Sequence, residues 1–232
     1  MRTLGLLGGM SWESTALYYR SINEGVRDRL GPLRSAELVM VSLDFGRIEA
    51  CQRDGRWDDA GALLADAAHR LQGAGAQGLV LCTNTMHKVA HHIEAAVPLP
   101  LLHIGDPTGR AAQAAGARTV GLLATGYTMR EPFYRERLEQ RFGLEVLVPD
   151  EPEREAVHRI IYDELCAGIV RDASREVYVR AIARLCGRGA QAIILGCTEI
   201  TMLVRPQDSP VPTLDTTALH AQAAVEFALD EG

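Results

Sequence analysis

Short apolar runs alternate with longer amphipathic stretches along the chain. The short runs predict buried strands at Leu4–Leu7, Leu38–Leu43, Gly78–Thr83, Thr119–Ala124, Glu145–Val148 and Ala192–Gly196. The amphipathic stretches predict helices at Ser14–Leu30, Trp57–Gln72, Glu131–Phe142, Glu153–Val170 and Ser174–Cys186. This alternation is typical of an α/β protein with a mainly parallel sheet.

The two halves of the sequence match in four segments that follow the same order. GAQGLVLCTNT, from Gly75, aligns without a gap on GAQAIILGCTE, from Gly189. The other pairs are AAHRLQGAGAQ with AIARLCGRGAQ, LGLLGG with VGLLAT, and DPTGRAAQAA with DTTALHAQAA, in which Asp106 and Asp215 are predicted helix N-caps. We therefore predict two similar lobes. Because chain ends often lie close together, residues 1–105 plus 208–232 are assigned to the first lobe and residues 106–207 to the second.

The gapless match places Thr83, and not Cys82, opposite Cys197. Both positions follow a predicted strand, where ligands of open parallel sheets bind. The first turn of a following helix would stabilise a thiolate, so a lowered pKa is expected for Cys197. Because neighbouring strand residues point to opposite faces, Cys82 is predicted to be a buried structural thiol if Thr83 faces a ligand.

Composition excludes several classes of function. Apolar residues make up 47% of the chain, and 24 basic against 30 acidic residues give a net charge of −6, which disfavours nucleic acids and anionic membranes as partners. No apolar run reaches the ~18 residues of a membrane span. Five cysteines without a C-x-x-C pair suggest neither disulfides nor zinc, and favour a cytoplasmic location. His91, His92 and Glu94 lack metal-site spacing, so no metal is expected.

Two signatures in this sequence resemble those of a known family. CTNTMHK, from Cys82 to Lys88, and LGCTEI, from Leu195 to Ile200, look like the signatures of the aspartate/glutamate racemase superfamily, and GLLGGMSWEST resembles the opening of its aspartate racemase branch. The resemblance implies two Rossmann-like lobes related by a pseudo-two-fold axis, with the active site in the cleft between them. It also implies a homodimer, an amino-acid substrate and racemisation by two cysteines without a cofactor. Lys88 is the only lysine, so only one residue could form the Schiff base that pyridoxal phosphate requires.

The sequence departs from this family at the first cysteine. The family's cysteine directly precedes Asn-Thr, whereas Thr83 occupies that place here. A threonine hydroxyl is a far weaker acid than a thiol. We therefore predict that Cys197 abstracts the α-proton and that Thr83 returns one, directly or through water, with a rate biased toward one enantiomer.

Further residues are candidate substrate ligands. Asn84, Thr85 and Thr198, which lie within the two signatures, would hold the α-carboxylate. Glu199 would orient Cys197 or meet the ammonium group of the substrate. For a side-chain carboxylate Gln52 is favoured over Arg47 and Arg53, which are more typical of solvated surface, whereas Glu164 would disfavour an acidic side chain. The full set of predicted substrate-binding residues is Met10, Gln52, Asn84, Thr85, Thr125, Glu164, Thr198 and Glu199.

Aspartate and glutamate are the substrates expected first, but two other functions stay open. One is a decarboxylase or a cis–trans isomerase of the same superfamily, since those chemistries also use one cysteine. The other is an amino-acid-binding protein that lost catalysis with its first cysteine. Product identity separates the two kinds of enzyme, and alkylation of Cys197 separates an enzyme from a binding protein.

Overall fold

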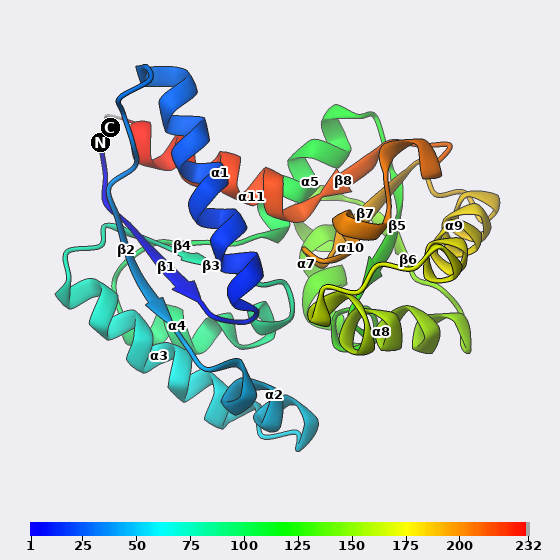
Figure 1. Cartoon of the computed structure of the whole chain (residues 1–232), viewed down its shortest axis with the longest axis horizontal. Helices are drawn as coiled ribbons and strands as arrows, with labels where there is room; N and C mark the ends of the chain where they lie inside the picture. Colours follow the sequence, from blue (N-terminus) through cyan, green and yellow to red (C-terminus); the bar gives the residue numbers. More distant parts are fainter. Residues whose placement is uncertain (231–232) are drawn as a thin grey trace. The chain divides into compact units, whose positions relative to one another are not determined.

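A computed structural model describes residues 1–230 and divides the chain into two compact α/β units. The first unit holds Met1–His103 and resumes at His220, and the second holds Ile104–Leu219. Figure 1 shows the helices and strands of each unit. Within the described residues, none of the helices combines the length and apolar character needed to cross a bilayer.

The first unit is built on a four-stranded parallel sheet of order β2-β1-β3-β4. Its strands are β1 (Leu4–Gly8), β2 (Leu38–Ser42), β3 (Gly78–Leu81) and β4 (Leu101–Leu102). Its helices are α1 (Trp12–Leu30), α2 (Phe45–Arg53), α3 (Trp57–Gly73), the 3-10 helix η1 (Thr85–Val89), α4 (Ala90–Ala96) and most of α11 (Thr216–Leu229). Parallel strands need long connections, and these helices provide them.

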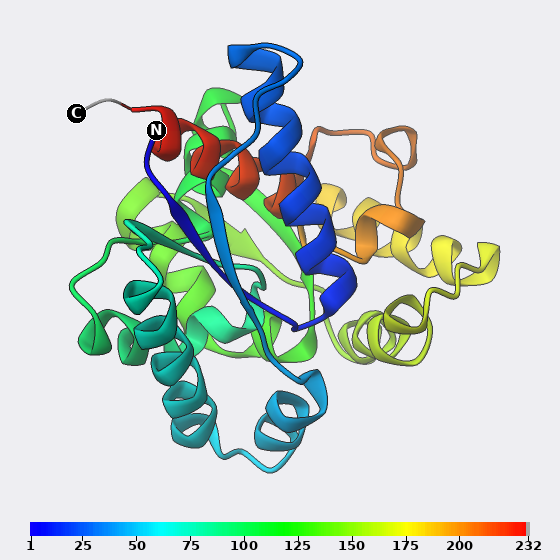
Figure 2. The same cartoon turned by 60° about the vertical axis from the view of Figure 1, so that its left-hand side comes forward.

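Alternate residues of this sheet pack into two separate cores. Leu6 and Val80 lie in one core with α1 and α11, whereas Leu79 and Leu81 lie in the other with α2, α3 and α4. Figure 2 shows α1 in blue and α11 in red on one side of the sheet and α3 in cyan on the other. Because the sheet is covered on both faces, its strands read as continuous apolar runs in the sequence.

The second unit repeats this plan with a parallel sheet of order β6-β5-β7-β8. Its strands are β5 (Thr119–Ala124), β6 (Glu145–Leu147), β7 (Ala192–Gly196) and β8 (Thr213–Asp215). Helix α5 (Gly105–Ala114) packs on α7 (Pro132–Phe142), and α8 (Glu153–Asp163) packs on α9 (Asp172–Gly187). The short elements are α6 (Gly126–Arg130), η2 (Leu165–Ala167), α10 (Ile200–Leu203) and η3 (Pro206–Asp208). The predicted helix at Glu153–Val170 is thus interrupted at Glu164.

Strand pairing confirms the register of the internal repeat. Leu79 pairs with Gly5 in the first sheet, and Ile193 pairs with Gly121 in the second. The sequence matches align Leu79 with Ile193 and Gly5 with Gly121, so the two pairs are equivalent. Thr83 and Cys197 therefore occupy equivalent positions, each two residues past the equivalent pair Leu81 and Leu195.

The helix after the fourth strand of each sheet belongs to the other unit. Helix α5 follows β4 of the first sheet but belongs to the second unit. Helix α11 follows β8 of the second sheet, and from His220 onward it belongs to the first unit. Because β8 pairs with β7, the return to the first unit comes later than the predicted residue 208. Asp215 does cap α11, since its carboxylate accepts hydrogen bonds from the N–H groups of Thr217 and Ala218.

Asp106, predicted as a cap, has another role. It lies inside the first turn of α5, and its carboxylate binds Arg137 at 2.6 Å and Arg141 at 2.8 Å. Burial opposes ionisation of this carboxyl, but the two guanidinium groups outweigh it and hold the pKa of Asp106 below its usual range. Asp106 therefore ties α5 to α7.

We expect Asp106→Asn to lower the free energy of unfolding by about 1–2 kcal/mol at pH 7. The native pKa is depressed, so the wild-type advantage is full above about pH 5. It disappears as the pH falls below the ordinary aspartate value of about 3.9 and through the lower native value. Urea unfolding of both proteins from pH 3 to 7 measures this, and a difference independent of pH would contradict the ion-pair explanation.

Candidate functional site

In the first unit, the turn after β1 brings the backbone of Gly9 close to the backbone of Leu43, which follows β2. A Cβ on Gly9 would lie 2.0 Å from the carbonyl oxygen of Leu43, and the φ of Gly9 is +94°, so this position requires glycine. The Gly9 N–H donates to Thr15 Oγ1 at 2.8 Å, and Ser11 caps α1. Met10, a predicted ligand, is 6% exposed and packs in the core under α2 and α3.

The turn after β3 separates the two candidate residues of the first signature. Cys82 is fully buried in the core beneath α1 and α11, as strand alternation predicts. Burial raises the pKa of its thiol, which therefore stays protonated at neutral pH. Thr83 is partly exposed, although Cys82 and Asn84 on either side of it are buried. The sheet thus turns Thr83, and not Cys82, out of the core.

His87 holds the backbone of this turn. Its Nδ1 lies 2.8 Å from the Thr83 carbonyl oxygen, and its ring packs edge-on against His103 with centroids 4.4 Å apart. A carbonyl oxygen only accepts, so Nδ1 of His87 carries the proton. Asn84 and Thr85, the predicted carboxylate ligands, are each 5% exposed in the same turn.

Gln52 lies on α2, in the connection that follows β2, and reaches the turn after β3. It is 4% exposed, and its amide donates to the sulfur of Met86 at 3.0 Å. Met86 follows Thr85 directly, so Gln52 lies beside the first signature, whereas Arg53 pairs with Glu49 at the surface. The structure therefore brings Gln52 to the turn that holds Thr83, Asn84 and Thr85, whereas Met10 shares an apolar core with Met86.

In the second unit, Cys197 is placed like Thr83. It is partly exposed between the buried residues Gly196 and Thr198. Its thiol donates to Glu199 Oε2 at 2.9 Å, and Glu199 is itself only 7% exposed. The hydroxyl of Thr198 accepts from Thr217 at 3.2 Å, which links this turn to the start of α11.

The expectation of a lowered pKa for Cys197 is wrong. Burial and the negative charge of Glu199 raise the pKa of this thiol well above its ordinary value. Helix α10 begins only at Ile200 and has four residues, so it offers a weak dipole against an adjacent carboxylate. Cys197 is therefore a thiol at neutral pH unless Glu199 is neutralised or given another partner.

Thr125 ends the neighbouring strand of the same sheet. Ala124 pairs with Gly196, so Thr125 and Cys197 leave the sheet side by side. Thr125 caps α6 by accepting from the N–H of Thr128, and it is 6% exposed. Its place in the second unit matches that of Gly9 in the first.

Glu164 is engaged at the junction of α8 and η2. Its carboxylate accepts from Ser174 at 2.6 Å and from Arg171 at 3.2 Å, and it lines a groove of about 340 Å³ between α8 and α9. Burial raises the pKa of the fully buried Tyr178, and the negative charge of Glu164 acts in the same direction. Sequence reasoning did not single out Tyr178, because its spacing on α9 is that of an ordinary core residue.

No group of three or more histidine, cysteine, aspartate or glutamate side chains in residues 1–230 has an arrangement suited to a metal ion. The two turns instead offer hydroxyls, amides, backbone N–H groups and one thiol next to a carboxylate. Such groups can bind a small carboxylate and exchange a proton with it.

The repeated four-stranded unit, with equivalent turns after its first and third strands, defines a protein of two duplicated α/β lobes. The sequence model of the Asp/Glu/Hydantoin racemase family matches residues 7–224. The chain belongs to this family, and the resemblance drawn from the two signatures is confirmed.

Solved structures support the same assignment. A presumed Asp/Glu racemase from Yersinia pestis is 54% identical, with a TM-score of 0.93 over 99% of this chain and 100% of that one. An aspartate racemase homologue from Pyrococcus horikoshii is 32% identical, with a TM-score of 0.85 over 98% and 99%. The broad specificity amino-acid racemase RacX of Bacillus subtilis is 24% identical over 97% of this chain and 98% of its own.

We expect Glu199→Gln to increase the alkylation of Cys197 by iodoacetamide roughly threefold or more at pH 8, because removing the negative charge favours the thiolate. Mass spectrometry of the peptide that contains Cys197 measures the rate. Glu176→Gln is the matched control, since Glu176 lies on α9 with its side chain 75% exposed and only a 3.8 Å ion pair to Arg180. A slower or unchanged rate in Glu199→Gln would show that the carboxylate does not hold the thiol protonated.

Proposed function

We propose that this protein is an amino-acid racemase in which Cys197 and Thr83 act on opposite faces of the substrate's α-carbon. One observation carries the proposal. Thr83 and Cys197 are equivalent in the duplicated fold, and each is the partly exposed residue between buried neighbours at the end of a central strand. A pair of equivalent positions suits a reaction that exchanges a proton between two faces of one carbon.

The proposed reaction moves protons only. Cys197, as the thiolate, takes the α-proton and becomes a thiol, leaving a carbanion stabilised by the carboxylate. Thr83 gives its hydroxyl proton to the opposite face, directly or through water, and regains a proton from solvent. Cys197 returns its proton to solvent, so no net proton is gained or lost.

Glu199 would prepare Cys197 for this step. In the substrate-free protein its carboxylate accepts a hydrogen bond from the thiol, and its negative charge opposes ionisation. The ammonium group of an amino acid bound beside Glu199 would reverse that effect, because an opposite charge lowers the pKa of the thiol. The thiolate would thus form when substrate binds.

Aspartate and glutamate are the substrates we propose to test first. The family and the aspartate racemase homologue support this choice. Asn84, Thr85, Thr125 and Thr198 would hold the α-carboxylate, and Gln52 would meet the side chain. The RacX relative acts with broad specificity, so a wider panel of amino acids belongs in the same experiment.

We further propose that no cofactor is needed and that the enzyme works in the cytoplasm as a homodimer. Lys88, the single lysine, has its ammonium 3.9 Å from the centre of the Trp57 ring, which leaves it poorly placed for a Schiff base. The described cysteines are all free, which suits a reducing compartment. The dimer rests on the family resemblance.

A second function follows from Thr83 itself. A decarboxylase or cis–trans isomerase needs one cysteine, and this site offers one thiol in contact with Glu199. A binding protein without turnover would need neither an ionisable Cys197 nor a proton donor at Thr83. The product formed decides among these alternatives.

Proton NMR in D2O without added cofactor tests the proposal. Each enantiomer of aspartate and glutamate, followed by other amino acids, should lose its α-proton signal, and chiral chromatography of the same samples should detect the opposite enantiomer. At saturating substrate, we expect kcat to be at least about tenfold larger in the direction in which Cys197 is the base, since Thr83 is the weaker partner. Equal kcat values for both enantiomers would contradict the asymmetry, and exchange with none of the amino acids would contradict the racemase.

Substitutions at the two strand ends test the assignment of roles. Thr83→Cys should accelerate the slow direction roughly tenfold or more, and Cys197→Ala should reduce both directions at least about a hundredfold. Cys82→Ala is the matched control, because it removes a neighbouring thiol that lies in the core. If Cys82→Ala abolished turnover while remaining folded by circular dichroism, Cys82 and not Thr83 would be the partner.

A further inference from the structure

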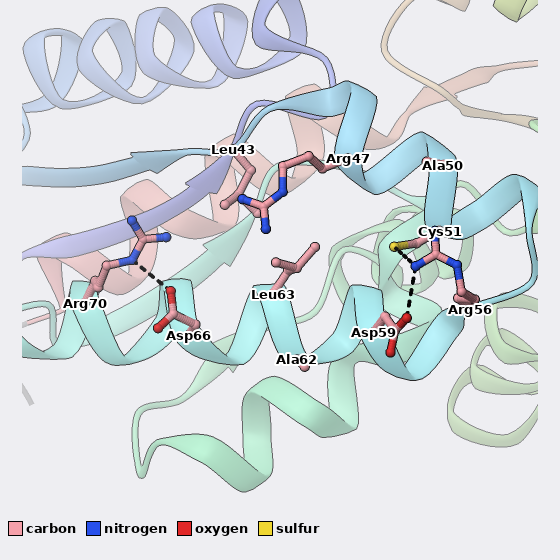
Figure 3. A pocket seen from close by; sticks show the side chains of 10 residues that line it. All are labelled: Leu43, Arg47, Ala50, Cys51, Arg56, Asp59, Ala62, Leu63, Asp66 and Arg70. Atoms are coloured by element: carbon pink, nitrogen blue, oxygen red, sulfur yellow. Dashed lines mark hydrogen bonds and ion pairs between the residues drawn. The ribbon is translucent and has the colours of Figure 1, made fainter.

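A groove of about 620 Å³ lies between α2 and α3 of the first unit (Figure 3). Leu43 and Leu63 form an apolar stretch of its wall, and Arg47, Arg56 and Arg70 surround it. Of the residues weighed as substrate ligands, Arg47, over which Gln52 was favoured, lines this groove, and none of the residues assigned to the substrate or to catalysis does. It is therefore a separate feature of the first unit.

Two of the three arginines are already neutralised. Arg56 contacts Asp59 at 2.9 Å and Asp54 at 3.1 Å, and Arg70 contacts Asp66 at 3.2 Å. These ion pairs balance the charge at the two ends of the groove, as the dashed lines of Figure 3 illustrate for Asp59 and Asp66.

Arg47 is different. Its side chain extends from α2 into the groove between Leu43 and Leu63 (Figure 3). Within residues 1–230 its guanidinium makes neither a hydrogen bond nor an ion pair, so its charge is unbalanced. The groove thus combines one available guanidinium with an apolar wall.

We propose that this groove binds a carboxylate that carries a short apolar chain. The planar guanidinium of Arg47 can donate two parallel hydrogen bonds to a carboxylate, and the chain would cover Leu43 and Leu63. A phosphate fits less well, because it has no apolar part to cover Leu43 and Leu63. The ligand class is a monocarboxylate.

This binding site is independent of the proposed racemisation. Gln52, the residue of α2 assigned to the substrate, contacts Met86 beside the first signature, whereas Arg47 lies in the groove. The inference therefore stands or fails on a binding measurement, whatever the enzyme assay gives.

Titration of the whole protein with sodium hexanoate at low salt tests the proposal. In protein labelled with 15N-arginine, the Nε–Hε signal of Arg47, identified by its absence from Arg47→Gln, should shift and saturate. Binding of hexanoate, followed by the signals of Arg56 and Arg70, should be roughly tenfold weaker in Arg47→Gln. Arg53→Gln is the matched control, since Arg53 lies on the same helix but pairs with Glu49 and does not line the groove.

Two further ligands test separately how much the negative charge and the apolar chain contribute to binding. Acetate should bind at least about tenfold more weakly than hexanoate, because it lacks the apolar carbons, and hexylammonium should not shift the Arg47 signal. The proposal is overturned if hexanoate produces no saturable shift or if Arg53→Gln weakens binding as much as Arg47→Gln. Equal binding of hexylammonium, or tighter binding of inorganic phosphate, would also overturn it.

Discussion

The alternation of side chains along β3 and β7 is the constraint on which the candidate site depends. Both strands are central in sheets covered on both faces, so each residue that leaves the sheet must enter one core, enter the other, or point away from both. Cys82 enters a core, and Thr83 is the next residue to escape burial. The same rule brings Cys197 out at the end of β7. The thiol of Cys82 therefore lies in the core rather than at the place that Thr83 occupies, because the pairing of β3 with β1 fixes which residue faces outward.

Much of the fold is predictable from the sequence, because the central strands are read directly from it. The predicted bounds of β5 and β7 agree with the structure, and the repeat gives the correct register of both sheets. Helices α2 and α4 escape prediction, since nine and seven residues show too few apolar positions to reveal a period. Strands β4 and β8 also escape prediction, because they have only two and three residues.

The backbone positions of the candidate residues are predictable from the sequence, but their electrostatics are not. Strand ends and signatures identify Thr83 and Cys197, because these depend on backbone position alone. The raised pKa of Cys197 depends on the side-chain rotamer that places Glu199 2.9 Å from the sulfur, and no pattern in the sequence reveals a rotamer. The interruption at Glu164, where α8 gives way to η2, likewise results from tertiary packing in a stretch that reads as one continuous helix.

The return of α11 makes the first unit depend on residues that follow the whole second unit in the chain. Ala221, Ala224 and Val225 of α11 complete the core that Tyr18 and Ile22 of α1 begin, yet they are encoded after the whole second unit. A ribosome that has finished β4 has therefore made every strand of the first sheet but not the helix that closes one of its faces. The core of the first unit is therefore complete only once α11 has been made, after the whole of the second unit.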